Sequence, residues 1–227
     1  LIIHFYLLLF LANPCQLTDT SCLKQAVAKL YSNAMVMDSA TGADDLDPMF
    51  QDIIEGKLSV VKYKLTDTTV KGLKKCEVES VKSSITLHVD LLCPKLSIYG
   101  KYHINGKVAM LPVKGSGDFR IETKKFQIKL DLQLKEVTVK DGQSYVTVID
   151  FKQMAEPLER MKFSFKNLFN GKNALLSDVL HTYANTRWKE FSVEVHDPVL
   201  DATLQKVINN VNLYFKKFSI KELSIDM

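Results

Sequence analysis

The sequence lacks the motifs that mark common catalytic, nucleotide-binding and metal sites. It contains no Gly-x-Ser-x-Gly elbow, no Walker lysine pattern and no dinucleotide fingerprint. Its histidines show no His-x-x-x-His or His-Glu spacing, and its four cysteines include no Cys-x-x-Cys pair. We therefore expect no catalytic residue, no metal site and no cofactor, and the protein is not predicted to be an enzyme.

The chain also lacks a concentrated charge of one sign and an Asn-x-Ser/Thr acceptor for N-glycosylation. It has 30 basic and 26 acidic side chains, which gives a net charge of +4. Lysine pairs at 74–75, 124–125 and 216–217 are spread along the chain, whereas nucleic-acid binders gather basic residues on one face. We interpret these pairs as solvated strand edges and helix ends, and we expect no nucleic-acid partner.

Long hydrophobic runs are absent beyond the first residues. Residues 1–12 are almost entirely apolar and resemble the apolar region of a secretory signal peptide. An initiator Met and a basic segment are missing before them, so we expect this signal peptide to be truncated in the given sequence. A buried N-terminal strand is the alternative. The run is shorter than the about 20 residues that span a bilayer, so we expect no membrane span. We predict that residues 13–227 form the mature, secreted protein.

The four cysteines suit an oxidising compartment and allow three complete pairings. Cys15 and Cys22 are seven positions apart at the start of the first predicted helix, so a disulfide between them would close a short loop. Cys76 and Cys93 flank a predicted hairpin whose turn lies near residues 82–84. Residues whose numbers add to about 169 would face each other across that turn, so this second pair could also bond.

The segment before residue 57 contains one predicted helix and one loop. Leu23, Val27 and Leu30 share one face of a helix over residues 21–33. Residues 38–47 are acidic and show no periodicity, and they lack the Gly and the distal Glu of a calcium-binding loop. We interpret them as a solvated acidic loop.

Apolar and polar residues alternate from about residue 57 to residue 169, which is typical of strands with one buried and one solvated face. Asn105-Gly106 and Asp141-Gly142 are predicted to form two-residue hairpin turns. Gly115 and Gly117 interrupt one strand, at a place where glycines often mark a bulge or a sharp bend.

Apolar residues recur at helical spacing from about residue 174 to residue 217, with a cap or kink at Asp197-Pro198. Helical structure over this range would span roughly 60–65 Å if it were straight, which exceeds a compact domain of this size. Strands followed by one long apolar helix indicate an α+β fold in which a curved sheet rolls around the helix. We expect an elongated single domain with a dry space beside the helix, which favours carrying an apolar ligand over catalysis.

Two blocks of the sequence, residues 96–119 and 167–190, contain the most specific motifs. These are Gly100-Lys101-Tyr102, Gly106-Lys107 and residues 111–119 in the first block, Asn167-Leu168-Phe169-Asn170-Gly171 and Trp188-Lys189-Glu190 in the second, with Cys15, Cys22, Leu46-Asp47-Pro48 and Gly72-Leu73 elsewhere. In these motifs the chain resembles the insect takeout and haemolymph juvenile-hormone-binding protein family. It looks closer to takeout than to the haemolymph carriers, which have a further cysteine pair towards the C-terminus. The resemblance implies a super-roll, in which a strongly curved antiparallel sheet wraps around a long C-terminal helix and encloses an apolar tunnel.

Candidate ligand-binding residues come from the apolar faces of the predicted strands and of the C-terminal helical region. They are Phe119, Leu130, Leu132, Val148, Phe165, Phe169, Leu180, Tyr183, Trp188, Phe191, Leu204 and Val211. A cavity wall and a packed core use the same residue types, so core packing is the alternative for each of them. The hydroxyls of Tyr145, Tyr183 and Tyr214 are candidates for polar contacts with a ligand.

Together with the resemblance, these observations predict a secreted, non-catalytic carrier of a small hydrophobic ligand, a terpenoid such as juvenile hormone or another long-chain lipid. The alternative is an extracellular signalling or interaction protein in circadian, feeding or chemosensory physiology. In that case a structural lipid would fill the tunnel and a cell-surface receptor would be the partner. An enzyme acting on a lipid ester is a third hypothesis, disfavoured because the sequence suggests no nucleophile constellation.

Overall fold

The computed structural model describes residues 15, 18–36, 38–40, 42–58, 61–108, 111–138 and 142–217. The predicted signal peptide of residues 1–12 lies outside the described residues. Helices and strands follow one another in the order α1 (Thr20–Ala34), β1 (Met49–Leu58), β2 (Val61–Lys71), the 3-10 turn η2 (Leu73–Lys75), β3 (Glu77–Ser83), β4 (Leu87–Val108), β5 (Leu111–Thr138), β6 (Ser144–Pro157), β7 (Lys162–Phe165), the 3-10 turn η3 (Phe169–Gly171), α2 (Ala174–Thr186) and α3 (Trp188–Lys217).

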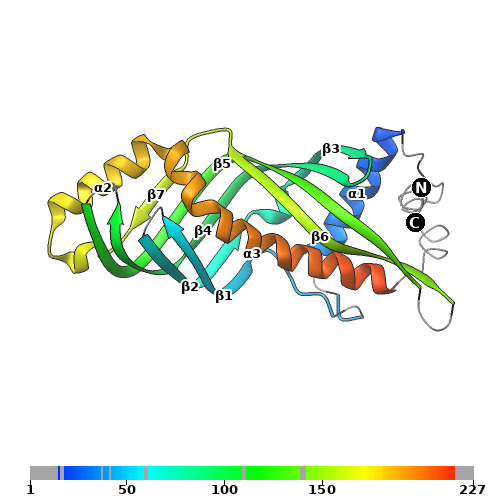
Figure 1. The fold of residues 1–227 in the computed structure, drawn as a ribbon, viewed down its shortest axis with the longest axis horizontal. Helices are drawn as coiled ribbons and strands as arrows, with labels where there is room; N and C mark the ends of the chain where they lie inside the picture. Colours follow the sequence, from blue (N-terminus) through cyan, green and yellow to red (C-terminus); the bar gives the residue numbers. More distant parts are fainter. Residues whose placement is uncertain are drawn as a thin grey trace.

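The strands form one seven-stranded antiparallel sheet that curves around α3 (Figure 1). Its main path runs β1-β2-β4-β5-β6, while β3 pairs with β4 and β7 pairs with β5. No strand pairing joins β1 to β6 among the described residues, so the sheet stays open there, and α3 packs against both of these strands. The predicted α+β architecture, a curved antiparallel sheet around a C-terminal helix, is confirmed.

The long hairpin of β4 and β5 runs through the middle of the sheet. Its pairing extends from Leu87 opposite Leu132 to Val108 opposite Leu111, without a shift of register. The prediction of a turn at Asn105-Gly106 is therefore wrong, because these residues pair with Lys114 and Val113 inside the ladder. Pairing beyond them adds further backbone hydrogen bonds, and these outweigh the local turn preference of Asn-Gly.

Gly115 and Gly117 also have a different role from the predicted bulge or bend. Both pair regularly with β4. A Cβ atom on Gly117 would lie 2.3 Å from the carbonyl oxygen of Lys166, and one on Gly115 would lie 3.0 Å from that of Asn167. The glycines therefore allow the segment after β7 to approach β5 closely.

The C-terminal helical region consists of two helices instead of one. The break falls at Arg187, whose φ and ψ are −99° and 40°. The predicted helix cap at Asp197-Pro198 is wrong because both residues lie inside α3, whereas the alternative, a kink at this proline, stays a prediction. Side chains of α2 explain the break in part. Asn185 accepts a hydrogen bond from the Phe163 N–H and donates one to the Phe163 carbonyl, both at 2.9 Å, which ties α2 to the edge of β7.

Helix α1 forms as the sequence predicts, and a disulfide holds its first turn. The Asp19 carboxylate caps the helix by accepting hydrogen bonds from the N–H groups of Ser21 and Cys22, at 3.1 and 3.0 Å. Cys22 is bonded to Cys15, with their Cα atoms 5.6 Å apart. This bridge fixes the chain that enters the helix.

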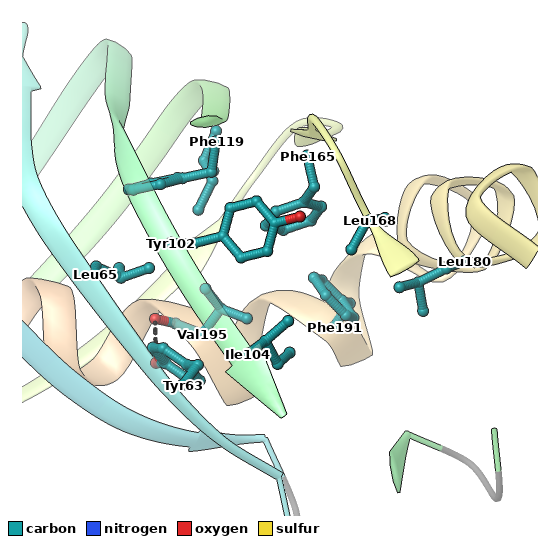
Figure 2. A pocket seen from close by; sticks show the side chains of 11 residues that line it. Tyr63, Leu65, Tyr102, Ile104, Phe119, Phe165, Leu168, Leu180, Phe191 and Val195 are labelled. Carbon is teal, nitrogen blue, oxygen red and sulfur yellow. Dashed lines mark hydrogen bonds between the residues drawn. The ribbon is translucent and has the colours of Figure 1, made fainter. Parts of the chain in front are cut away.

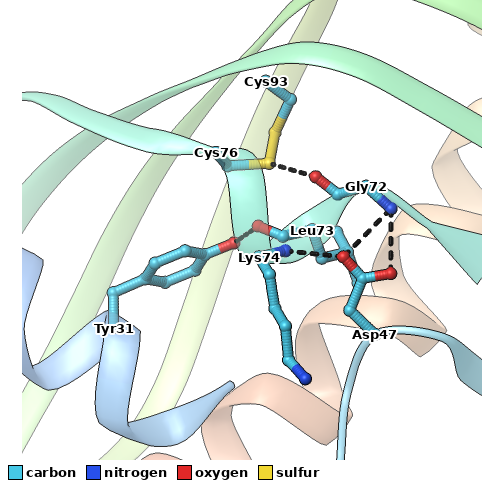
Figure 3. Close-up of a disulfide and its surroundings, with 7 residues drawn as sticks. All are labelled: Tyr31, Asp47, Gly72, Leu73, Lys74, Cys76 and Cys93. Carbon is cyan, nitrogen blue, oxygen red and sulfur yellow. Dashed lines mark hydrogen bonds between the residues drawn. A yellow bond between two sulfur atoms is a disulfide. The ribbon is translucent and has the colours of Figure 1, made fainter. Parts of the chain in front are cut away.

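The second disulfide joins Cys76 and Cys93, next to a hydrogen-bonded loop (Figure 3). Asp47 is not a solvated loop residue as predicted, because its carboxylate accepts hydrogen bonds from the Gly72 and Lys74 N–H groups at 2.9–3.1 Å. From α1, the Tyr31 hydroxyl donates to the Leu73 carbonyl at 2.7 Å. These contacts bind α1 and the 44–48 segment to the turn between β2 and β3.

Candidate functional site

Two apolar cavities lie between the concave face of the sheet and the C-terminal helices. The first is at the α2 end, where side chains from several strands point toward α3 (Figure 2). Its lining consists of Tyr63, Leu65, Tyr102, Ile104, Phe119, Ile121, Phe165, Leu168, Leu180, Phe191 and Val195. Edge-to-face aromatic contacts order this wall, with ring centroids 5.5 Å apart for Tyr102 and Phe165 and 6.4 Å apart for Phe165 and Phe191.

The second cavity lies at the α1 end of the molecule, under the C-terminal half of α3. Its lining consists of Val27, Leu30, Tyr31, Leu87, Val89, Leu91, Leu130, Leu132, Leu134, Val148, Leu204, Val207, Ile208, Val211 and Phe215. Strand alternation explains this set, because every second residue of β4 and β5 points to the same face of the sheet. The helical residues recur every three or four positions and face the same space.

Both cavities are narrow. The centre of a water-sized molecule has about 40 Å³ of space in the first cavity and about 70 Å³ in the second. One water needs roughly 10–15 Å³ by this measure, so each cavity has room for a few waters at most. A ligand of terpenoid size would therefore have to move side chains apart.

The tyrosine hydroxyls around the cavities already have partners. Tyr63 donates to the Val195 carbonyl at 3.3 Å and Tyr102 to the Lys166 carbonyl at 2.8 Å. Burial raises the pKa of Tyr63 to about 12, with a smaller contribution from the charge of Asp197, and burial raises the pKa of Tyr102 to about 12. Burial, followed by the charge of Asp47, also raises the pKa of Tyr31. These hydroxyls are therefore neutral and engaged, which leaves the lining effectively apolar.

The structure brings together nine of the twelve predicted ligand-binding residues, in two groups. Phe119, Phe165, Leu180 and Phe191 line the first cavity, and Leu130, Leu132, Val148, Leu204 and Val211 line the second. Among the described residues, Phe169, Tyr183 and Trp188 line neither cavity: Phe169 and Trp188 pack against the core from the outside, and Tyr183 is 39% exposed.

Sequence reasoning missed the tyrosines that do line the cavities, Tyr31, Tyr63 and Tyr102. Strand alternation placed Tyr63 and Tyr102 on a buried face, but nothing local indicated that the backbone would satisfy their hydroxyls. The Tyr145 hydroxyl, predicted to contact ligand, instead donates to Gln143 at 2.9 Å.

A Ser-His-Asp arrangement, which the sequence did not suggest, lies outside the cavities. His88 Nδ1 contacts the Asp131 carboxylate, and Nε2 lies 3.2 Å from the Ser84 hydroxyl oxygen. Pairing of β4 with β5 brings His88 opposite Asp131, although they are 43 positions apart in the chain. The side chains of His88 and Asp131 are 43% and 51% exposed. Solvent therefore screens this pair, which differs from the buried, water-excluded triads of hydrolases.

Metal and membrane features were also sought in the described part of the chain. Nowhere in it do three or more His, Cys, Asp or Glu side chains converge in a way that could hold a metal ion. Its helices include none that is both long and apolar enough to cross a membrane.

Comparisons with known proteins agree with this geometry. The circadian clock-controlled protein daywake of Drosophila melanogaster is 27% identical over 207 residues, covering 83% of this chain and 77% of that protein. Daywake of Drosophila yakuba is 26% identical over 148 residues, covering 65% and 55%. The crystal structure of Epiphyas postvittana Takeout 1 matches with a TM-score of 0.83 at 26% identity, covering 92% of this chain and 97% of that one. Residues 7–225 match the family described as haemolymph juvenile hormone binding protein, and the chain therefore belongs to this family.

Proposed function

We propose that the protein is a secreted, non-catalytic carrier of a small hydrophobic ligand, a terpenoid or another long-chain lipid. The observation that supports this most directly is the pair of apolar cavities between the sheet and α3. Membership of a family named for a haemolymph hormone-binding protein supports the same class of function. The two disulfides suit the oxidising conditions outside the cell.

The energetics allow useful affinity even though the cavities are narrow. A ligand that buries roughly 400 Å² of apolar surface gains about 10 kcal/mol. Loss of rigid-body freedom and displacement of side chains reduce this by several kcal/mol, which leaves about 6–8 kcal/mol and dissociation constants of about 1–40 μM. Selectivity by shape is expected to dominate, because the tyrosine hydroxyls of the lining are engaged with backbone carbonyls.

Native and denaturing mass spectrometry of the purified protein tests the proposal. A carrier releases an apolar small molecule on denaturation, and a terpenoid competitor displaces that molecule under native conditions. A protein that is empty and takes up no apolar probe contradicts the carrier function. A stoichiometric molecule that does not exchange would instead favour an interaction protein that contains a structural lipid and acts through a receptor.

A further inference from the structure

The two cavities lie one after the other along β4, β5 and α3. On β5, Phe119 lines the first cavity and Leu130 the second, and Phe126 lies between them in the strand. On α3, Val195 lines the first cavity and Leu204 the second. The two cavities share no lining residue, so the buried side chains between these positions form a partition between them.

His196 belongs to this partition. Its ring meets that of Phe126 edge to face, with centroids 5.8 Å apart and an interplanar angle of 84°. The residue is only 8% exposed, so its ring is buried beside Phe126.

The hydrogen-bonding groups of His196 are unsatisfied. Four buried side-chain nitrogen and oxygen atoms have no hydrogen-bond partner within the described residues, and two of these are the ring nitrogens of His196. Nδ1 lies 2.7 Å from Asp197 Oδ1, although the angles there do not suit a hydrogen bond. A buried polar group without a partner destabilises the folded state, so an unpaired imidazole between residues that line the two cavities is a candidate contact for a bound molecule.

The contact with Asp197 distinguishes the two ring nitrogens. In a neutral imidazole, a carboxylate oxygen this close to Nδ1 favours the tautomer with the proton on Nδ1, because two facing lone pairs would repel each other. Nε2 is then a bare acceptor. A matching ligand group must donate a hydrogen bond, as a hydroxyl does and an ether or ester oxygen does not.

We propose that His196 is the polar anchor of the ligand site and that the ligand is an elongated apolar alcohol. Its hydroxyl donates to His196 Nε2 at the partition, and its chain occupies the cavities on either side. This inference rests on the carrier function proposed above, and it adds the position and chemical class of the one polar contact.

The test compares the binding of farnesol with that of farnesyl methyl ether, which has the same chain but no donor. The wild-type protein should bind the alcohol about 3- to 10-fold more tightly, as expected for one hydrogen bond. In His196→Phe this ratio should fall to about one while the ether still binds. His196→Gln, which keeps an acceptor oxygen, should retain part of the preference. His103→Asn, on the exposed face of β4, should leave the ratio unchanged.

A second measurement needs no variant. In the ¹⁵N-labelled wild-type protein, the imidazole Nε2 signal of His196 should shift on addition of farnesol and not on addition of the ether. Three results would contradict the role of His196 as the polar anchor. They are equal affinities of the wild-type protein for the two probes, a preference for farnesol that persists in His196→Phe, and an Nε2 signal that does not shift on addition of farnesol. If neither probe bound the wild-type protein, the anchor proposal would fail for terpenoid ligands, while the mass spectrometry described above tests the carrier function separately.

Discussion

Asn212, near the end of α3, satisfies the backbone of Val148 as a neighbouring strand would. Its side-chain oxygen accepts a hydrogen bond from the Val148 N–H at 2.8 Å, and its side-chain nitrogen donates to the Val148 carbonyl at 3.0 Å. Val148 lies on β6, at one end of the strand order. Asn185 makes the same pair of bonds from α2 to Phe163. Helical amides thus take the place of a missing strand at two points along the β6 and β7 side of the sheet.

Replacing Asn212 with Ala should lower the free energy of unfolding by about 2–4 kcal/mol, since it leaves one donor and one acceptor of a buried residue unpaired. Urea denaturation measures this loss. Asn209→Ala is the matched control, because Asn209 lies exposed on the same helix. Equal stabilities of the two variants would show that the Asn212 contacts contribute little.

Filling the first cavity should block ligand uptake. Ile104→Trp places an indole in a space with little free volume, so we expect at least about a tenfold loss of affinity for an apolar fluorescent probe. Val193→Trp adds the same side chain at a position of α3 that is 58% exposed, and it should bind as the wild type does. Undiminished binding by Ile104→Trp would place the ligand elsewhere.

The buried tyrosines make stability depend on alkaline pH. Tyr63 and Tyr102, with pKa values raised to about 12, keep their protons where the tyrosines of an unfolded chain, with a pKa of about 10, have lost them. The folded state therefore binds more protons between about pH 10 and 12. Stability is fully present below pH 10 and falls above it by about 1.4 kcal/mol per pH unit for each tyrosine.

Urea denaturation across this pH range, with tyrosinate absorbance as a second signal, measures the slope. In Tyr63→Phe, the decrease of the free energy of unfolding with pH should be smaller by the contribution of one tyrosine, about 1.4 kcal/mol per pH unit. A slope that is unchanged in this variant would mean that Tyr63 ionises in the folded protein.

The surface arrangement of Ser84, His88 and Asp131 should not hydrolyse esters. Its exposed His-Asp pair lacks the dry surroundings that make such pairs effective, so nitrophenyl ester turnover should equal that of Ser84→Ala. Release of nitrophenol by the purified protein measures this. Turnover that is lost specifically in Ser84→Ala would instead make the protein an esterase.

His196→Phe should raise the free energy of unfolding by about 1–2 kcal/mol, because a phenyl ring of similar size removes two unsatisfied buried nitrogens. Thermal and urea denaturation of the ligand-free protein test this. His103→Phe, an exposed position, should give no such gain. A destabilised His196→Phe would mean that the imidazole has partners in the folded protein.

Much of the architecture could be predicted because the spacing of apolar residues, every second position in strands and every third or fourth in helices, indicates which face of each element is buried. The Cys76–Cys93 bridge agrees with the register predicted from the turn near residue 83, since Val78 pairs with Leu91 and their numbers also add to 169. Most candidate site residues line the cavities for the same reason. Strand β1, however, was missed, because its exposed face includes Phe50 and Ile53 and the polar-apolar alternation is weak there.

The failures concern features that local sequence does not determine. The Asn105-Gly106 turn and the helix cap at Asp197-Pro198 were predicted from short-range preferences, which the long β4–β5 ladder and the packing of α3 outweigh. The hydrogen bonds of the buried tyrosine hydroxyls and the contact between His88 and Asp131 all depend on partners that are 42 or more positions away in the chain. Such partners become visible only once the register of the sheet is known.

The unshifted register of β4 and β5 also constrains how this chain can vary in length. Because side chains alternate between faces, inserting or deleting one residue within either strand would turn the following wall residues outward. The strand pairs β2–β4 and β5–β6 each contain a register shift, near Thr66 and near Gln133. At these two places one strand already has an extra residue without a partner in the neighbouring strand. Single-residue length changes should therefore be tolerated beside those two irregularities and destabilising within the paired part of the central hairpin, where they would turn the residues that line a cavity towards solvent.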